Sequence, residues 1–278
     1  MAIQLQRSSP VSSCIYLERK TTNMSNAATK PVIVIVPGAW HVPAHYAYLA
    51  LKLNSIGYTV DCLELSSTND EKDLPENTWI EDINIIRNAI TSHTEAGRDV
   101  AVVMHSFGGM TGSEAACGLG KKESETSGAV VKLIYMTAFM IQEGQTRASL
   151  GVGDDWPEIA ELDDPKNPKA LVPLDPKHFF YHDVPEQKTQ RALDNLGGCP
   201  LSHVMNTPTK VAWREIPTAY LICEDDRALT FNGQKQLIDA VRAQGVEVEV
   251  ASLKASHSPF LSMPGETAKA IHGFLEKA

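Results

Sequence analysis

The sequence predicts an α/β protein built on a mainly parallel, doubly wound sheet. From Lys30 onward, short runs of β-branched residues alternate with amphipathic stretches that end at glycine. This alternation is typical of a parallel sheet covered by helices on both faces. A chain of 278 residues with 43% hydrophobic and 21% charged residues can bury one extensive core, and an α/β fold of this size normally forms a single domain.

The first half of the chain predicts a regular succession of strands and helices. The strands are continuous apolar runs, and the residues Trp79, Ile83, Ile86 and Ile90 recur at helical spacing. In chain order the predicted elements are a strand at 31–36, a helix at 43–55, a strand at 58–65, a helix at 78–96, a strand at 100–105, a helix at 108–119 and a strand at 130–137.

The alternation stops between Met140 and Trp213, a segment rich in proline and acidic residues. A structureless loop of this length is uncommon in a compact domain, so we expect an inserted, mostly helical cap over the carboxyl edge of the sheet. The pattern then resumes with a strand at 218–223, a helix at 232–244, a strand at 246–251 and a final helix at 265–277. The expected organisation is a core formed by residues 30–139 and 214–278, a cap at 140–213, and a disordered N-terminal extension at 1–29.

The run from Val100 to Gly109 predicts a buried strand that turns sharply at Ser106 and enters a helix at Gly108. This is the pattern of a nucleophile elbow, in which a tight turn exposes a serine hydroxyl beside the free amides of a helix N-terminus. The usual pattern is G-x-S-x-G, whereas this chain has Met104 two positions before the serine. On this run alone, an ordinary strand–turn–helix with an incidental serine stays open as an alternative.

A serine hydroxyl needs a histidine base before it can act as a nucleophile at neutral pH. His257 follows the strand predicted at 246–251, so it is expected at the carboxyl edge of the sheet, where Ser106 also lies. His105 is nearer in sequence, but a side chain adjacent to Ser106 on a sharp turn points elsewhere. The sequence therefore favours His257 as the base and a packing role for His105.

The base in turn needs an acid that orients it. The consecutive acids Glu224, Asp225 and Asp226 follow the strand predicted at 218–223, at the same expected edge of the sheet. The order serine, acid, histidine along the chain distinguishes one group of serine hydrolases from the others.

Four motifs together resemble the α/β-hydrolase superfamily, from about Lys30 to the C terminus. They are the turn at 36–41 after the first core strand, the Ser106 elbow, the acid loop that begins at Asp226, and the histidine loop at 256–261. The compact form is similar to plant methylesterases, to hydroxynitrile lyases and to fungal and bacterial hydrolases. The resemblance implies the α/β-hydrolase fold, with the helical cap inserted after the sixth strand of that fold.

The resemblance also implies a role for particular residues. It makes Ser106 the nucleophile, His257 the general base and, from the spacing to Thr230, Asp226 the orienting acid. The implied oxyanion donors are the backbone N–H groups of Ala39 and Phe107. The candidates for the substrate pocket are Trp40, His41, Phe179 and Phe180.

The pocket candidates have plainer alternatives. Trp40 could equally be core, and the stretch that contains Phe179 and Phe180 could only dock the cap onto the core. His41 and His45 stand four residues apart and could share a metal, but no third ligand is in view, and catalytic zinc sites normally take three protein ligands.

The composition of the chain indicates which classes of binding partner and which cellular compartment to expect. The formal net charge of −9 argues against nucleic acid as a partner, because phosphate binding needs basic patches. No apolar run is long enough for a membrane span, and no glycine-rich phosphate loop is present. The five scattered cysteines favour a reducing compartment over a disulfide framework. We therefore expect a cytoplasmic protein with a small-molecule substrate, no metal and no organic cofactor; the oligomeric state stays open.

The function predicted from these residues is serine-dependent hydrolysis of a carboxylic ester or lactone of a small, mostly apolar molecule, through an acyl-enzyme intermediate. Fold does not fix reaction. A hydroxynitrile-lyase-like or C–C bond hydrolase reaction on the same triad stays open, and Lys188 or Lys210 could supply the charge that often marks such lyases. A ligand receptor with a slow triad is the alternative from another class.

Overall fold

The structure is a computed structural model that describes residues 30–68, 78–122, 128–146, 159–163 and 170–276. The N-terminal extension expected at 1–29 lies outside the described residues. Within them, no helix combines the length and the apolar character that crossing a bilayer requires.

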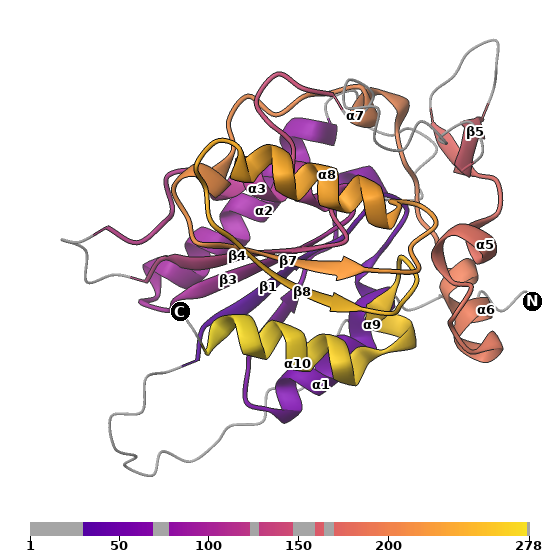
Figure 1. Ribbon diagram of the computed structural model, residues 1–278, viewed down its shortest axis with the longest axis horizontal. Coiled ribbons are helices and arrows are strands. Elements are labelled where there is room, and N and C mark those ends of the chain that lie inside the picture. The colour runs from indigo at the N-terminus through magenta and orange to yellow at the C-terminus, as the bar shows by residue number, and fades with distance from the viewer. Residues whose placement is uncertain (1–29, 69–77, 123–127, 147–158, 164–169, 277–278) are drawn as a thin grey trace, which may run out of the picture.

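A six-stranded sheet forms the centre of the described chain, in the order β2-β1-β3-β4-β7-β8, with every neighbouring pair parallel (Figure 1). Parallel strands need crossover connections, which the chain supplies as helices. The strands are β1 (Val32–Val36), β2 (Val60–Cys62), β3 (Val100–His105), β4 (Val130–Met136), β7 (Thr218–Cys223) and β8 (Val248–Leu253).

Helices cover both faces of the sheet, as the alternation in the sequence predicts. One layer contains α1 (Ala47–Ser55) and α10 (Pro264–Leu275), and the other contains α2 (Thr78–Glu95), α3 (Gly108–Ala116) and α8 (Phe231–Arg242). Successive strand residues point to opposite faces, so Ile33 and Ile35 join the cluster on the α1 and α10 side, whereas Val34 and Val36 join the cluster on the α2 and α3 side.

Several elements differ from their predicted bounds. The helix expected at 43–55 begins as a 3-10 turn, η1 (Pro43–Tyr46), and the strand expected at 58–65 is reduced to the three residues of β2. The helix expected at 108–119 ends at Ala116. A short helix that the sequence did not predict, α9 (Pro259–Ser262), precedes α10. The remaining 3-10 segments are η2 (Ser66–Thr68) and η4 (Ala212–Arg214).

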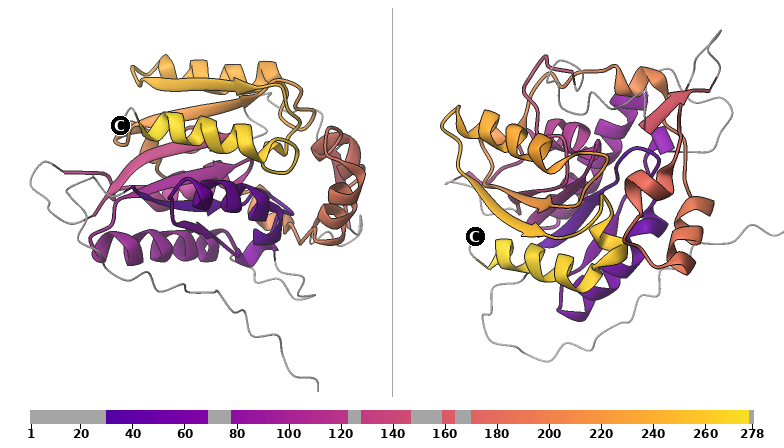
Figure 2. Two further views of the ribbon diagram at one scale, coloured as in Figure 1. Left: turned by 90° about the horizontal axis from the view of Figure 1, so that it is seen from below. Right: turned by 45° about the vertical axis from the view of Figure 1, so that its right-hand side comes forward.

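The segment between Met140 and Trp213 contains helices, as expected, and also a small antiparallel pair of strands that was not predicted. Its described elements are β5 (Ala160–Leu162), β6 (Leu171–Pro173), α5 (Pro176–Phe180), α6 (Glu186–Asp194) and α7 (Leu201–Val204). Helices α5 and α6 stand beside the end of the sheet to which the strand arrows point, apart from the two helical layers (Figures 1 and 2). This end of the sheet carries the candidate site.

Candidate active site

Ser106 lies in a sharp turn between β3 and α3. Its φ is 50°, in the left-handed region that non-glycine residues rarely adopt. The neighbouring backbone is so close that Gly108 needs to be glycine, since a Cβ there would lie 2.4 Å from the Pro37 carbonyl oxygen. The turn therefore has the strained backbone and close approach of a nucleophile elbow.

Met104 occupies the elbow position where the usual pattern has glycine, and the structure shows how it fits. Met104 is fully buried, and its side chain packs against Gly112 on α3. A Cβ on Gly112 would lie 2.8 Å from the Met104 Cγ and Sδ atoms. The absence of a side chain at Gly112 therefore provides the space that the Met104 side chain occupies.

Asp226 and His257 are joined by a hydrogen bond of 2.7 Å between Oδ2 and Nδ1, and both residues are buried. Asp226 follows β7, and His257 follows β8, at the same end of the sheet as the Ser106 turn. The Asp226 carboxylate is held in place from both sides. Its Oδ1 accepts the backbone N–H groups of Ala228 (2.7 Å) and Leu229 (2.9 Å), and its Oδ2 accepts the Thr137 hydroxyl.

The other two acids of the run are placed differently. Glu224 and Asp225 are exposed, and the Glu224 carboxylate accepts the Ser252 hydroxyl at 2.6 Å. Of the three consecutive acids, Asp226 is the one that the structure brings to His257.

His105 connects the histidine loop to the serine turn. Its Nε2 lies 3.0 Å from the backbone oxygen of His257, and the two rings are 4.7 Å apart. In the described part of the chain, no hydrogen bond joins Ser106 Oγ to the His257 ring. The exposed fraction of Ser106 is 9%, and the residue directly follows His105 at the end of β3.

The turn after β1 faces the Ser106 elbow. A Cβ on Gly38 would lie 2.8 Å from both His105 Nδ1 and Ser106 Cβ, so the two turns are in direct contact. Within the described residues, neither the Ala39 nor the Phe107 backbone N–H has a hydrogen-bond acceptor. Two amides of adjacent turns are therefore available to a substrate oxygen.

His41 and His45 lie side by side, with ring centroids 4.9 Å apart, but their nitrogens already have protein partners. His41 bonds the Ala39 carbonyl and the Tyr181 hydroxyl, whereas His45 bonds the Ala192 carbonyl and the backbone of Val42. Among the described residues, no group of three His, Cys, Asp or Glu side chains is arranged to hold a metal ion.

Three of the four pocket candidates gather near His257. The Phe180 ring lies 5.7 Å from the His257 ring and 5.7 Å from the Trp40 ring, on which it stacks, and His41 lies 5.7 Å from Phe180. Phe179 is only partly buried and packs on the margin of the same apolar cluster. Trp40 and Phe180 are nearly fully buried, so they belong to the core as well as to the surroundings of the site.

Sequence reasoning missed Tyr46 and Thr137. Tyr46 contacts His105 and Gly38, and no local pattern indicates it. Thr137 directly follows β4, so the rule that placed His257 and Asp226 at the carboxyl edge of the sheet also applies to it.

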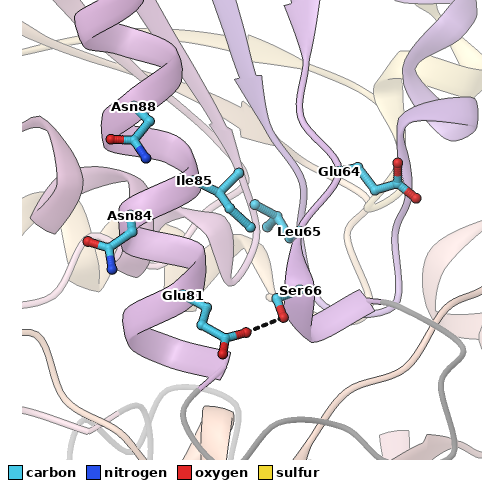
Figure 3. A pocket seen from close by; sticks show the side chains of 7 residues that line it. All are labelled: Glu64, Leu65, Ser66, Glu81, Asn84, Ile85 and Asn88. Atoms are coloured by element: carbon cyan, nitrogen blue, oxygen red, sulfur yellow. Dashed lines mark hydrogen bonds between the residues drawn. The ribbon is translucent and has the colours of Figure 1, made fainter.

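A surface groove of about 650 Å³ lies away from these residues, between η2 and α2 (Figure 3). Its lining contains the carboxylates of Glu64 and Glu81 and no basic side chain, and Glu81 already accepts the Ser66 hydroxyl at 2.5 Å. Because none of the residues described above lines this groove, we place the candidate site at the end of the sheet instead.

Comparison with known proteins agrees with this architecture. A family model described as "Alpha/beta hydrolase family" matches residues 33–270. The "Alpha/beta hydrolase nvfD" of Aspergillus novofumigatus (strain IBT 16806) is 33% identical over 244 residues, which are 87% of this chain and 95% of that protein.

Solved structures share the fold at low sequence identity. The methylesterase MES16 from Arabidopsis superposes with a TM-score of 0.70 at 17% identity, covering 89% of this chain and 100% of its own. A pyrethroid hydrolase from Sphingobium faniae JZ-2 superposes with a TM-score of 0.66 at 20% identity, covering 88% of this chain and 97% of its own.

Proposed function

The chain belongs to the alpha/beta hydrolase family, and on that premise we propose that it is a serine-dependent hydrolase that cleaves a carboxylic ester or lactone of a small, mostly apolar molecule. The observation that carries this proposal is the buried Asp226–His257 hydrogen bond at the same end of the sheet as the strained Ser106 turn. A histidine paired with a carboxylate beside a serine on an elbow is the arrangement that activates a hydroxyl for acyl transfer.

In this mechanism Ser106 is the nucleophile. The His257 Nδ1–H donates to Asp226, which leaves Nε2 unprotonated in the neutral ring and able to take the serine proton. The Ser106 hydroxyl gives its proton to this nitrogen. The Ser106 oxygen then attacks the ester carbonyl, and the C=O electron pair moves onto oxygen.

The Ala39 and Phe107 backbone N–H groups stabilise the oxyanion that forms. Donors fixed before the reaction are the most effective contributors to such catalysis, and losing one raises the barrier by about 3 kcal/mol. The His257 proton then passes to the departing alcohol, and water attacks the acyl-enzyme with His257 again as base.

The surroundings support an apolar substrate. Phe180 lies beside His257, and Phe260 lies beside His105. Phe107, which follows Ser106, packs with Phe139 and Leu229 in a separate apolar cluster. The names methylesterase and pyrethroid hydrolase, carried by two proteins of the same fold, agree with ester hydrolysis.

The observations do not favour a lyase reaction. Lys188 donates to the Leu261 carbonyl at 3.1 Å and lies over the Tyr48 ring, and Lys210 is exposed. Neither lysine contacts Ser106, Asp226 or His257 within the described residues. The division into a core at 30–139 and 214–278 with a cap at 140–213, and the cytoplasmic location, stay predictions.

The proposal is tested with p-nitrophenyl acetate and p-nitrophenyl butyrate. Wild type, Ser106→Ala and the control Ser92→Ala, an exposed serine on α2, are compared at equal concentration. We expect turnover in wild type and in the control and its loss in Ser106→Ala. Equal rates in all three would overturn the proposal. Cleavage of a cyanohydrin in preference to esters would favour the lyase alternative, and tight binding without turnover would favour a receptor.

A further inference from the structure

The turn that carries the proposed oxyanion donor Ala39 is strained. The His41 N–H closes it by donating to the Gly38 carbonyl at 3.1 Å, and Trp40 between them has a φ of 63°. That conformation favours glycine, and a residue as bulky as tryptophan keeps it only when the surroundings impose it. The contacts that impose it are therefore informative about the site.

The His41 ring is one of these contacts. Its Nδ1 lies 2.8 Å from the Ala39 carbonyl oxygen, which can only accept, so Nδ1 carries the proton. Burial lowers the pKa of His41 well below its ordinary value, so the ring is neutral and Nε2 is an acceptor. The Tyr181 hydroxyl, 3.0 Å away, therefore donates to Nε2.

Two further bonds tie the same turn to residues 171–197, the segment that contains β6, α5, α6 and Tyr181. The Trp40 indole N–H donates to the Leu171 carbonyl at 2.8 Å. The Gly197 N–H donates to the Trp40 carbonyl at 2.8 Å. The strained residue is thus held by its side chain and by its backbone, and the contacts come from far along the chain.

We propose that His41 is a positioning residue for ester hydrolysis, and that residues 171–197 complete the oxyanion site by locking its ring through Tyr181. The inference rests on the proposed function. The carbonyl and the following amide of one peptide point in opposite directions, so holding the Ala39 carbonyl fixes the peptide that joins Ala39 to Trp40. Without this bond the peptide turns over, relieves the strain at Trp40 and reorients Ala39, whose N–H is the oxyanion donor.

The chain offers a matched control for this Tyr–His bond. The Tyr58 hydroxyl lies 2.8 Å from His272 Nδ1, in a bond that is part-buried, whereas the Tyr181–His41 bond is buried. Tyr58 precedes β2 and His272 lies on α10, so this second Tyr–His pair is at the opposite end of the sheet from Ser106. Tyr58→Phe removes the same type of bond as Tyr181→Phe without touching the site.

Substitutions at His41 separate its two bonds. Asn places a donor near the Nδ1 position and keeps the bond to Ala39, whereas Gln places its amide near the Nε2 position and loses it. His41→Asn is therefore the conservative variant, and His41→Gln and Tyr181→Phe are the disruptive ones.

Each variant is assayed for kcat and KM with p-nitrophenyl acetate and for inhibition by an aryl trifluoromethyl ketone. In that adduct the Ser106 oxygen bonds to the ketone carbon, the serine proton moves to His257, and the ketone oxygen becomes the oxyanion. The inhibitor therefore reports the oxyanion site directly, which a general loss of stability does not.

We expect Tyr181→Phe and His41→Gln to lower kcat about tenfold, with KM changed by less than about twofold and inhibition weakened by the same factor as kcat. Tyr58→Phe keeps wild-type values, and His41→Asn recovers most of kcat. The inference is wrong if Tyr181→Phe has the kcat of wild type, or if the substitution changes only KM. If His41→Gln does not fold, the result for Tyr181→Phe alone tests the inference.

Ser106→Ala in the same series tests the proposed function. If Ser106→Ala retains turnover, the proposed function and this inference are both wrong. If turnover depends on Ser106 but is unaffected by Tyr181→Phe, only the inference is wrong.

Discussion

Tyr46 donates its phenol proton to Nδ1 of His105 across 2.9 Å, although the two residues lie 59 positions apart in the chain. The direction follows from the other side of the ring, where Nε2 faces the His257 carbonyl at 3.0 Å. Because a carbonyl oxygen only accepts, Nε2 carries the proton and Nδ1 is left as the acceptor. The Tyr46 oxygen also accepts the Gly38 N–H at 3.1 Å. One buried chain of hydrogen bonds therefore connects the turn after β1, the residue before Ser106 and the histidine loop.

Removing the Tyr46 hydroxyl is expected to destabilise the fold. Tyr46→Phe keeps the ring but leaves the buried Gly38 N–H and His105 Nδ1 without their partner, which costs about 1–3 kcal/mol for each group left unsatisfied. Urea denaturation of Tyr46→Phe and Tyr58→Phe measures the effect. We expect the larger loss at Tyr46, because the Tyr58 bond is part-buried and water can replace it. Equal losses in the two variants would contradict this account.

Asp226 and Asp225 are expected to differ sharply in their effect on activity. Asp226→Asn replaces a carboxylate oxygen that accepts the His257 Nδ1–H and the Thr137 hydroxyl, so the ring loses the partner that fixes its tautomer. If Asp226 has the role proposed above, kcat is expected to fall by about four orders of magnitude, as it does when the acid of a serine-protease triad is replaced by its amide. Asp225→Asn alters an exposed side chain and keeps wild-type kcat. Ester assays on the two variants compare them, and the reverse pattern would show that the acid has been misassigned.

The sheet could be predicted where its strands are buried on both faces. The predicted bounds of β3 and β7 match the structure at Val100–His105 and Thr218–Cys223, because continuous apolar runs are typical of central parallel strands. The strand expected at 58–65 was too long because apolar patterning reports burial and not pairing. Leu63 and Leu65 are buried, but β2 is an edge strand and pairs with β1 over only three residues.

The site could be predicted only as far as local patterns reach. Strand ends predicted that Ser106 and His257 lie at one edge of the sheet, and the family spacing to Thr230 favoured Asp226 among the three consecutive acids. The contacts of Asp226 depend on the loop after β7, where the Ala228 and Leu229 amides fold back onto it. No spacing in the sequence indicates that Tyr181 reaches His41, 140 residues away. Contacts of this kind depend on how the segment between Met140 and Trp213 packs, for which the sequence contains no repeating pattern.

Alanine substitutions at Gly108 and Gly273 are expected to have opposite effects on the free energy of unfolding. Gly108→Ala places a Cβ 2.4 Å from the Pro37 carbonyl oxygen and 2.9 Å from that of Val36, and backbone cannot move aside as a flexible side chain can. We expect a loss of about 3 kcal/mol. Gly273→Ala, in α10 with nothing within 4 Å of the new Cβ, gains about 0.5–1 kcal/mol from helix propensity.

Thermal denaturation of the two glycine variants checks the prediction, because their midpoints are expected to shift in opposite directions from that of wild type. A Gly108→Ala variant as stable as wild type would show that the approach of the two turns is looser than described.

Asp82, which contacts His203 beside Phe107, is expected to make the stability of the fold depend on pH. Its carboxylate is fully buried on α2, where it accepts the Ser67 N–H (3.1 Å) and hydroxyl (2.5 Å). Burial outweighs these bonds and raises the pKa of Asp82 to about 6. His203 Nε2 lies 3.7 Å away, but burial lowers the pKa of His203 to about 3, so the histidine is neutral and Asp82 takes up the proton on acidification.

The sign of the effect follows from proton binding. Between an ordinary aspartate pKa of about 4 and the folded-state value of about 6, the folded protein binds more protons at Asp82 than the unfolded chain does. The free energy of unfolding therefore falls as pH rises through this window. Asp82→Asn removes this contribution, because the amide stays neutral and still accepts the Ser67 N–H. We expect the free energy of unfolding of wild type, relative to that of Asp82→Asn, to be higher at pH 4 than at pH 7 by on the order of 3 kcal/mol.

Urea denaturation of both proteins across that pH range measures this difference, with the exposed Asp225→Asn as control. Parallel curves for wild type and Asp82→Asn would mean that Asp82 has an ordinary pKa in the folded protein.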